Sequence, residues 1–425
     1  MLKHLPINKI AAGVTLSVLT AAAMTASTSA ATTMPISFHA WKNGGFSQGS
    51  LSDLHIGNSQ GKPALALNNG SDSGTWTSNT FTLPAPVDRI VTSWQADAPG
   101  DSWTETKLQV QLTDGSWSHW YTTGTWAFNS TANADGSFTS RRASPPSQDD
   151  AAGYIDQDTF WANTTKVKAY RVQEVLHAEN GQAPKVRQVA AIAADTSQDI
   201  DEQGQVSPVS NTTMKRTIDL NLPSYSEYAH NGQYTQLDGG GAAWCSPASV
   251  AMVLGYYHTG PTAAQIQSLP ADAVFDASNR KDGAVNYAAY HIFDNGVDMN
   301  KNTGDWPFNT AYAASFGMNS SVRQYNSLQD LEQWIKKGVP VTVSIQWDNT
   351  SSDVTQHLDG SSIAKTPGHL MVVGGFTKDG DVIAYDPASP AGDQQVRHTY
   401  NRAQFEHLWL RSKEGTVYII KPQAR

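Results

Sequence analysis

The sequence predicts an α+β protein in which an all-β, sandwich-like first half precedes a second half of helices and strands. Three observations support this prediction. Short segments of alternating apolar and polar residues are separated by turn signals in the first half, a polar segment follows, and helical patterns then give way to apolar strands. At 425 residues, the chain is long enough for two or three domains.

Residues 35–194 have the pattern of a β domain. Apolar and polar side chains alternate in residues 89–94 and 106–112, and tight-turn pairs such as Asn69-Gly70 and Asp135-Gly136 separate the runs. Several short strands at this spacing predict a β-sandwich. Three tryptophans could form a sugar-stacking face or belong to the core, which is the commoner place for them in alternating strands: Trp117, Trp120 and Trp126.

Residues 1–30 are typical of a bacterial signal peptide. Lys3 and Lys9 accompany a short apolar run over residues 10–23, and residues 28–30 (TSA) resemble a signal-peptidase site. The alternative is an uncleaved membrane anchor, but the run is short and rich in alanine. We therefore expect a secreted, periplasmic or cell-wall-associated protein that is not inserted in the membrane once the signal is removed.

The segment 195–215 is polar, acidic and rich in serine and glutamine, which predicts a linker to a second domain at 216–425. In that domain, residues 246–257 and 327–337 have helical patterns. The second helix is expected to begin with a capping box of Ser327 and Asp330 and to end at Gly338. Four apolar runs predict strands: residues 341–347, 370–376, 382–385 and 417–420.

Composition excludes several classes of function. The formal net charge of −9 provides no basic stripe for nucleic acid. A single cysteine rules out an intramolecular disulfide and a thiolate zinc site. No glycine-rich phosphate loop precedes a helix, and neither HExxH nor CxxC occurs, so we predict no metal and no nucleotide or other cofactor.

The lone cysteine, Cys245, lies in a sequence suited to a nucleophile. Glycines at 239–241 allow the chain to approach closely, and a helix is predicted to start directly after Cys245, with Pro247 in its first turn. The positive end of the helix dipole favours the thiolate. A buried, inert thiol is the plainer alternative.

His369 and Asp386 are the candidate partners of Cys245. His369 follows Pro367-Gly368 at the start of a strongly apolar strand, where a polar ring needs a partner or a cleft. A hairpin turn at residues 378–380 returns the chain so that Asp386 ends the adjacent strand. A carboxylate there can accept the imidazole N–H and fix its tautomer, although a structural histidine and an ordinary Asp-Pro turn remain the alternatives.

These segments resemble the C39-like peptidases, a papain-like group. The resemblance covers roughly residues 220–422 and is carried by WCSPAS (244–249), WPFNTAY (306–312), GHLMVV (368–373) and YDPA (385–388), with Gln404-Phe405 and Val417-Tyr418 near the end. A tryptophan-rich β half before such a domain is similar to secreted bacterial members. The resemblance implies a papain-like fold and a Cys-His-Asp triad of Cys245, His369 and Asp386 that acts through a thioester.

One position departs from that family. A glutamine that helps to bind the oxyanion is expected in a Pro-x-Tyr-Ser-Gln pattern, but this chain has PSYSE, which ends at Glu227. A carboxylate donates only when it is protonated, and one such donor is worth roughly 3 kcal/mol of transition-state stabilisation. Gln236 is the preferred replacement and Gln233 the second, with the backbone N–H of Cys245 remaining if neither serves.

The sequence therefore predicts a secreted cysteine peptidase that acts on a peptide or protein substrate. A cell-wall peptide amidase or transferase with the same triad is the first alternative, and the β half could then engage a cell-wall peptide or glycan. The second alternative is a catalytically inactive secreted binding protein, for which Glu227 is the best support.

Overall fold

The computed structural model describes residues 34–132, 138–198, 209–272, 274–275, 280–296 and 301–423. The predicted signal peptide, the turn at Asp135-Gly136 and the middle of the predicted linker, residues 199–208, lie outside these ranges. Within the described ranges, no helix combines the length and the apolar character needed to cross a membrane.

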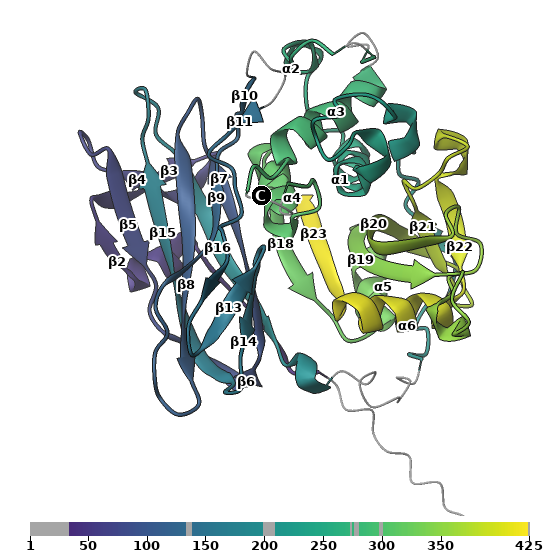
Figure 1. Ribbon diagram of the computed structural model, residues 1–425, viewed down its shortest axis with the longest axis horizontal. Helices are drawn as coiled ribbons and strands as arrows, with labels where there is room; N and C mark the ends of the chain where they lie inside the picture. Colours follow the sequence, from purple (N-terminus) through teal and green to yellow (C-terminus); the bar gives the residue numbers. More distant parts are fainter. Residues whose placement is uncertain are drawn as a thin grey trace, which may run out of the picture. The chain divides into compact units, whose positions relative to one another are not determined.

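The regular structure described between residues 34 and 194 consists of strands, apart from the short 3-10 helix η1 (Asn43–Gln48) (Figure 1). The strands are β1 (Ile36–Lys42), β2 (Ser50–Ser52), β3 (Leu54–Ser59), β4 (Lys62–Leu67), β5 (Ser73–Thr77), β6 (Phe81–Val87), β7 (Arg89–Asp97), β8 (Trp103–Leu112), β9 (Tyr121–Trp126), β10 (Thr131–Ala132), β11 (Phe138–Thr139), β12 (Gln148–Asp149), β13 (Gly153–Asp156), β14 (Thr159–Ala162), β15 (Val167–His177) and β16 (Lys185–Ala194).

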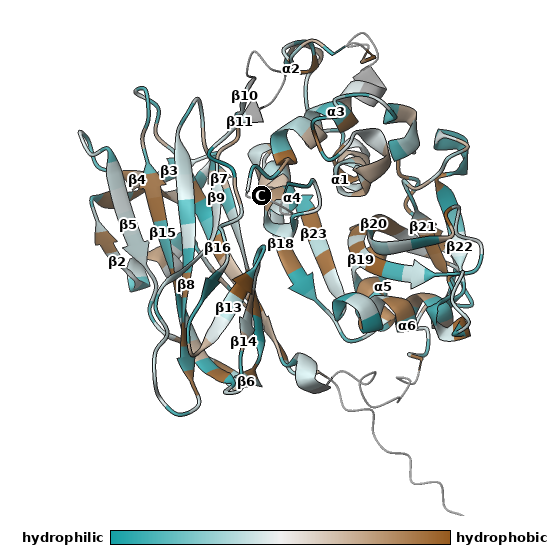
Figure 2. Cartoon of the chain, in the orientation of Figure 1, coloured by the Kyte–Doolittle hydropathy of each residue, from teal (hydrophilic) through white to brown (hydrophobic). Residues whose placement is uncertain are grey.

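These strands form two large antiparallel sheets. One has the order β12-β13-β14-β7-β16-β4-β3, with β1 paired to β16, and the other has the order β2-β5-β15-β8-β9, with β6 paired to β15. The alternating segments 89–94 and 106–112 lie in β7 and β8, as predicted. Figure 2 shows apolar residues alternating with hydrophilic ones along such strands, which is the pattern expected when one face of a sheet is buried.

The tryptophans of this half divide between core and surface. Trp76, Trp94 and Trp126 are fully buried in an apolar cluster that contains residues of both halves, and burying a side chain of this size contributes roughly 2–3 kcal/mol. Trp117 is 38% exposed and, with Trp120, lies against the guanidinium of Arg171, 5.0 and 5.1 Å from the two ring centroids. The prediction of a core role therefore holds for Trp126, and Trp117 lies at the surface.

The second half contains six helices among its described residues and one antiparallel sheet. The helices are α1 (Cys245–Tyr256), α2 (Ala263–Gln267), α3 (Arg280–Ile292), α4 (Trp306–Ser315), α5 (Leu328–Lys336) and α6 (Arg402–Lys413), with short 3-10 helices that include η3 (Glu227–His230) and η4 (Gly241–Ala243). The strands are β17 (Ile218–Asp219), β18 (Met318–Gln324), β19 (Val341–Asp348), β20 (Lys365–Phe376), β21 (Val382–Tyr385), β22 (Arg397–Tyr400) and β23 (Thr416–Pro422).

The sheet of this half has the order β18-β23-β19-β20-β21-β22, with β17 paired to β20. Side chains on β20 alternate between two apolar clusters. Leu370 and Val372 belong to the cluster that includes residues of α1, whereas Met371 and Val373 belong to the cluster that includes residues of α5 and α6. Helices therefore cover both faces of the sheet, so the strand that carries His369 is held from two sides.

The predicted helices and strands of this half are present, with small differences at their ends. The first helix begins at Cys245 rather than at residue 246, and β20 begins at Lys365, four residues before His369. The capping box is not formed, because Ser327 makes no side-chain bond to the helix backbone and its hydroxyl donates instead to the Asp330 carboxylate at 3.2 Å. Gly338, just past α5, has φ +73°, as a helix stop requires.

Several buried polar contacts join the two halves within one compact unit. The buried Arg142 guanidinium donates to the carbonyl oxygens of Phe293 and Tyr290 in the second half and of Ala127 in the first. At the end of the predicted linker, the backbone N–H of Ser210 donates to Glu406 at 2.7 Å. This part of the segment is therefore bound to the second half.

Candidate active site

Cys245 is the first residue of α1, and its side chain is partly exposed. No side chain caps the helix at Trp244. Pro247 lies in the first turn, where its missing N–H leaves no helical hydrogen bond unmade. The other backbone N–H groups of this turn thus remain available near the sulfur, and the helix dipole favours a negative charge there.

The glycine run before Cys245 is required by close packing. A Cβ on Gly241 would lie 2.2 Å from the backbone carbonyl carbon of His230, the last residue of η3. Only glycine allows η4 to approach η3 this closely. Because η3 begins at Glu227, this packing also brings Glu227 toward the helix that carries Cys245.

His369 and Asp386 form a buried pair. Nε2 of His369 lies 2.7 Å from Oδ1 of Asp386, and the two residues are 2% and 0% exposed. The carboxylate also accepts hydrogen bonds from the backbone N–H of Ala388 at 2.9 Å and from the hydroxyl of Tyr400 at 2.8 Å. Trp347 packs edge-on against the imidazole, with ring centroids 5.3 Å apart.

The electrostatics of the pair favour the charged form of both side chains. Burial alone would lower the pKa of His369, but the charge and hydrogen bond of Asp386 and the interaction with Cys245 raise it well above its usual value. Burial would raise the pKa of Asp386, but His369, Tyr400 and the Ala388 N–H together lower it. Since Nε2 is taken by Asp386, the second ring nitrogen is the one left to interact with the Cys245 side chain.

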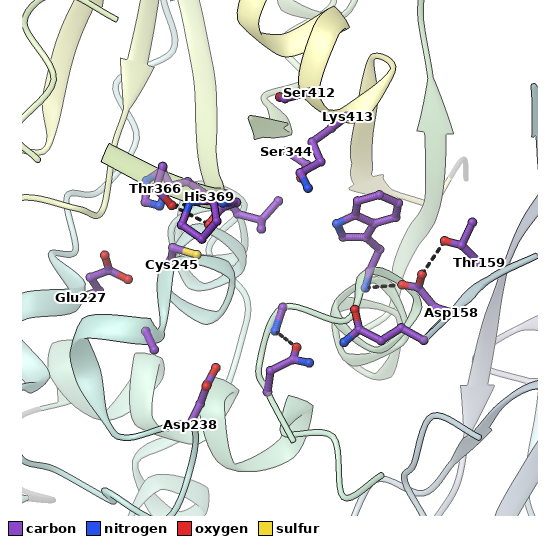
Figure 3. Close-up of a pocket in the computed structure, with 18 of the residues that line it drawn as sticks. Asp158, Thr159, Glu227, Asp238, Cys245, Ser344, Thr366, His369, Ser412 and Lys413 are labelled. Atoms are coloured by element: carbon purple, nitrogen blue, oxygen red, sulfur yellow. Dashed lines mark hydrogen bonds between the residues drawn. The ribbon is translucent and has the colours of Figure 1, made fainter. Parts of the chain in front are cut away.

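The nucleophile and the base of the proposed triad meet in a cavity of about 740 Å³. Figure 3 shows Cys245 next to the His369 ring, with Glu227 on the same side of the cavity. The structure thus brings together Cys245, His369 and Asp386, the three residues singled out from the sequence, through the β20–β21 hairpin and the start of α1.

The two glutamines considered as oxyanion donors lie elsewhere. Gln236 is exposed and is not among the residues that line the cavity. Gln233 is buried, but its Oε1 is 3.0 Å from Nδ1 of His230 and accepts from Asn286 at 2.7 Å. Glu227, by contrast, lines the cavity.

The first half of the chain contributes to the opposite wall of the cavity. Arg89 on β7 pairs with Glu414 at the end of α6, and its guanidinium lies between the rings of Trp161 and Trp306, 5.1 and 5.2 Å from their centroids. Asp158, also on this wall, accepts the backbone N–H of Trp306 at 3.0 Å.

Sequence reasoning missed this wall and the supporting contacts of the pair. Tyr400 ends a short strand with no motif around it, and Arg89 was seen only as part of a strand. Trp347 closes a predicted strand, which was the one available signal for its place beside His369. Among the described residues, no group of His, Cys, Asp or Glu side chains is arranged to hold a metal ion. The described side chains at this site offer the chemistry of a thiol, an imidazole and carboxyl groups.

Two models of protein families match this chain. The model of the Peptidase C39 N-terminal domain matches residues 26–194, and that of the Peptidase_C39 like family matches residues 220–417. Among solved structures, a candidate C39-like peptidase from Bacillus anthracis is 14% identical with a TM-score of 0.29, covering 49% of this chain and 100% of its own. The structure of PfGH50B is 10% identical with a TM-score of 0.17, covering 43% of this chain and 25% of its own. The search of curated proteins gave no match.

The two family matches span most of the chain between them, and both belong to the same peptidase group. This protein is a member of the C39-like peptidase family.

Proposed function

We propose that this protein is a secreted cysteine peptidase that hydrolyses peptide bonds with Cys245 as nucleophile, His369 as acid and base, and Asp386 as the residue that orients His369. The observation that carries the proposal is the buried His369–Asp386 pair at 2.7 Å beside the only thiol of the chain, in a cavity large enough for a peptide segment. A buried charge pair reduces the stability of the fold unless its hydrogen-bond geometry is excellent. Here the ring nitrogen of His369 that Asp386 does not bind is on the side of a potential nucleophile, Cys245.

The reaction follows from these positions. The thiolate of Cys245 attacks the peptide carbonyl, and the imidazolium of His369 gives its proton to the leaving amine, which leaves a thioester on the sulfur. Water then loses a proton to His369, attacks the thioester carbonyl and releases the acid, and the sulfur departs as thiolate. Asp386 keeps the imidazole in one orientation and stabilises its charged form in both steps.

We also propose a papain-like arrangement for the second half. In support, the nucleophile begins a helix whose buried side packs on an antiparallel sheet, and Ser249 on that helix donates to the carbonyl of Leu370 on β20 at 3.1 Å. The residue before Leu370 is His369, so this bond fixes the helix next to the strand that carries the base.

The test measures alkylation of the thiol first and hydrolysis of a protein substrate second. Alkylation of Cys245 by iodoacetamide is measured from pH 5 to 10 in the wild type and in His369→Ala, with His357→Ala as the matched control because His357 does not line the cavity. We expect fast alkylation near pH 6 in the wild type and in the control, and slower alkylation in His369→Ala.

Hydrolysis of casein is then compared in the wild type and in Cys245→Ala. Loss of hydrolysis in Cys245→Ala, with unchanged circular dichroism, is the expected result. Hydrolysis that persists in a pure Cys245→Ala sample would exclude Cys245 as the nucleophile. Alkylation of the wild type that is slow at pH 6 and unaffected by His369→Ala would support an inactive binding protein instead.

A further inference from the structure

Glu227 is fixed at the edge of the cavity by its own backbone. Glu227 is the first residue of η3 and is 3% exposed. Its backbone N–H donates to the carbonyl oxygen of Pro387 at 3.0 Å. Pro387 directly follows Asp386, so the segment that pairs with His369 also binds the backbone of Glu227. The side chain therefore has a defined position relative to Cys245 and His369, with which it lines the cavity (Figure 3).

One oxygen of this carboxyl group has nothing to bind in the protein. Oε2 of Glu227 is buried and has no hydrogen-bond partner among the described residues. An unpaired buried polar atom destabilises the folded protein, and an ionised one does so more strongly. A group in this position is expected to be neutral, and its O–H can then be satisfied by an acceptor that enters the cavity.

The titratable groups around Glu227 lie on several neighbouring segments. They are His369 on β20, Asp386 after β21 and Asp238 before η4, with Tyr228 next in η3 and the Cys245 thiol on α1. The pKa of Glu227 is raised to about 8: burial is the main cause, the charge of His369 opposes it, and the charges of Asp386 and Asp238 add smaller increases. Glu227 is therefore mostly protonated at neutral pH.

We propose that neutral Glu227 donates a hydrogen bond to the oxyanion that forms when Cys245 attacks a substrate carbonyl. This inference depends on the proposed function. The first-turn backbone of α1 supplies the other donor, and Glu227 keeps its proton as the oxyanion forms and as it collapses, so no proton is consumed. Glu227 in place of glutamine thus still provides a hydrogen-bond donor, but its donation depends on pH.

The proposal predicts an alkaline limit that a glutamine would not have. Above about pH 8, Glu227 loses its proton, the donor disappears, and a negative charge faces the developing oxyanion. Substitution by glutamine restores a donor that does not titrate. Glu227→Gln should therefore match the wild type near pH 6.5 and exceed it near pH 9.

The experiment separates oxyanion stabilisation from thiol reactivity with two probes. Acylation of Cys245 by p-nitrophenyl acetate passes through a tetrahedral oxyanion, whereas alkylation by iodoacetamide displaces iodide at a saturated carbon and forms none. The ratio of the two rate constants is measured from pH 6 to 10 in the wild type, Glu227→Gln and Glu227→Ala. Gln236→Ala is the control, because Gln236 is the alternative donor considered from the sequence and is exposed.

Removal of one oxyanion donor costs about 10²–10³-fold in rate. We expect the acylation-to-alkylation ratio to fall by that factor in Glu227→Ala at pH 6.5, to be kept in Glu227→Gln, and to be unchanged in Gln236→Ala. A ratio that is unaffected in Glu227→Ala, or a pH profile of Glu227→Gln identical to that of the wild type, would overturn the proposal. Failure of the proposed function is recognised separately, since the wild-type thiol would then show no enhanced alkylation near pH 6.

Discussion

Replacement of Asp386 by asparagine removes the negative charge from the His369–Asp386 pair and changes the shape of the side chain very little. Oδ1 of Asp386 accepts from His369 and Ala388, and Oδ2 accepts from the Tyr400 hydroxyl. An asparagine oxygen can take the place of Oδ1, and its NH₂ group can donate to the Tyr400 oxygen, because a hydroxyl can reverse its role. The variant should therefore keep the hydrogen bonds and lose only the negative charge.

The size of the effect follows from the 2.7 Å separation. Two unit charges at this distance attract by about 6 kcal/mol at an effective dielectric constant of 20. Part of this energy offsets the desolvation of the carboxylate, and a neutral hydrogen bond worth about 1 kcal/mol remains in the variant. A net loss of about 3 kcal/mol corresponds to a reduction of roughly 10²-fold in a rate that needs the imidazolium.

The effect of Asp386→Asn on the alkylation rate should depend on pH. Asp386 is a main reason why the pKa of His369 lies above its usual value, so its removal lowers that pKa. A smaller fraction of His369 is then charged near pH 6.5, so the ring stabilises the thiolate less. Alkylation of Asp386→Asn by iodoacetamide should be about 10²-fold slower than that of the wild type at pH 6.5, and the two rates should converge toward pH 10.

Tyr400→Phe is the matched control, because it removes one hydrogen bond from the same carboxylate and leaves its charge. Such a bond to a charged group is worth about 1.5–3 kcal/mol, but the carboxylate keeps its charge and its bonds to His369 and the Ala388 N–H, so a smaller loss of rate is expected. Equal alkylation of Asp386→Asn and wild type at pH 6.5 would refute the assignment of Asp386, provided that circular dichroism shows both to be folded.

Two further predictions concern stability. Arg142→Met should destabilise the fold by about 2–6 kcal/mol, since it removes the donor to the carbonyls of Tyr290 and Ala127 and one of the two donors to that of Phe293; a shift of less than about 1 kcal/mol in urea unfolding would contradict this role. Glu174→Gln should raise the melting temperature at pH 9 and change it little at pH 5. Burial raises the pKa of Glu174 from 4.5 to about 8, so the wild type loses stability as pH rises between these values and glutamine does not; equal melting temperatures at pH 9 would contradict this.

The candidate site could be predicted where its geometry is set by local chemistry. The turn at residues 378–380 pairs β20 with β21, with Val372 opposite Tyr385, and this pairing alone brings His369 near Asp386. The glycines and proline around Cys245 likewise specify a close approach followed by a helix. These features depend on a few neighbouring residues, so the sequence shows them directly.

The missed parts depend on contacts between distant residues. Helix α6 was not predicted because its buried face includes Arg402 and Glu406, which look like solvent-exposed residues in the sequence. In the structure, Arg402 donates to Glu332 at 2.8 Å, and Glu406 accepts from the backbone N–H of Leu328 and of Ser210. A charged side chain can be recognised as buried only once its partners are known.

The placement of Glu227 in the cavity and of Gln236 outside it was missed for a related reason. Side-chain chemistry alone favours an amide over a carboxyl group as a donor at neutral pH, so Gln236 was preferred. That argument assumes an ordinary pKa for the acid, whereas the pKa of Glu227 is raised to about 8, mainly by burial. Burial is a property of the folded chain, and the sequence around Glu227 gives no sign of it.

The cavity also shows why the two halves should be studied together. Arg89 of the first half pairs with Glu414 of the second and lies between Trp161 and Trp306, which themselves come from different halves. A second half expressed alone would leave Glu414 without this cation, and the cavity would lose the residues that the first half contributes to its lining. We therefore expect the reactivity of the thiol to depend on residues of the second half, and the choice of substrate to depend on both.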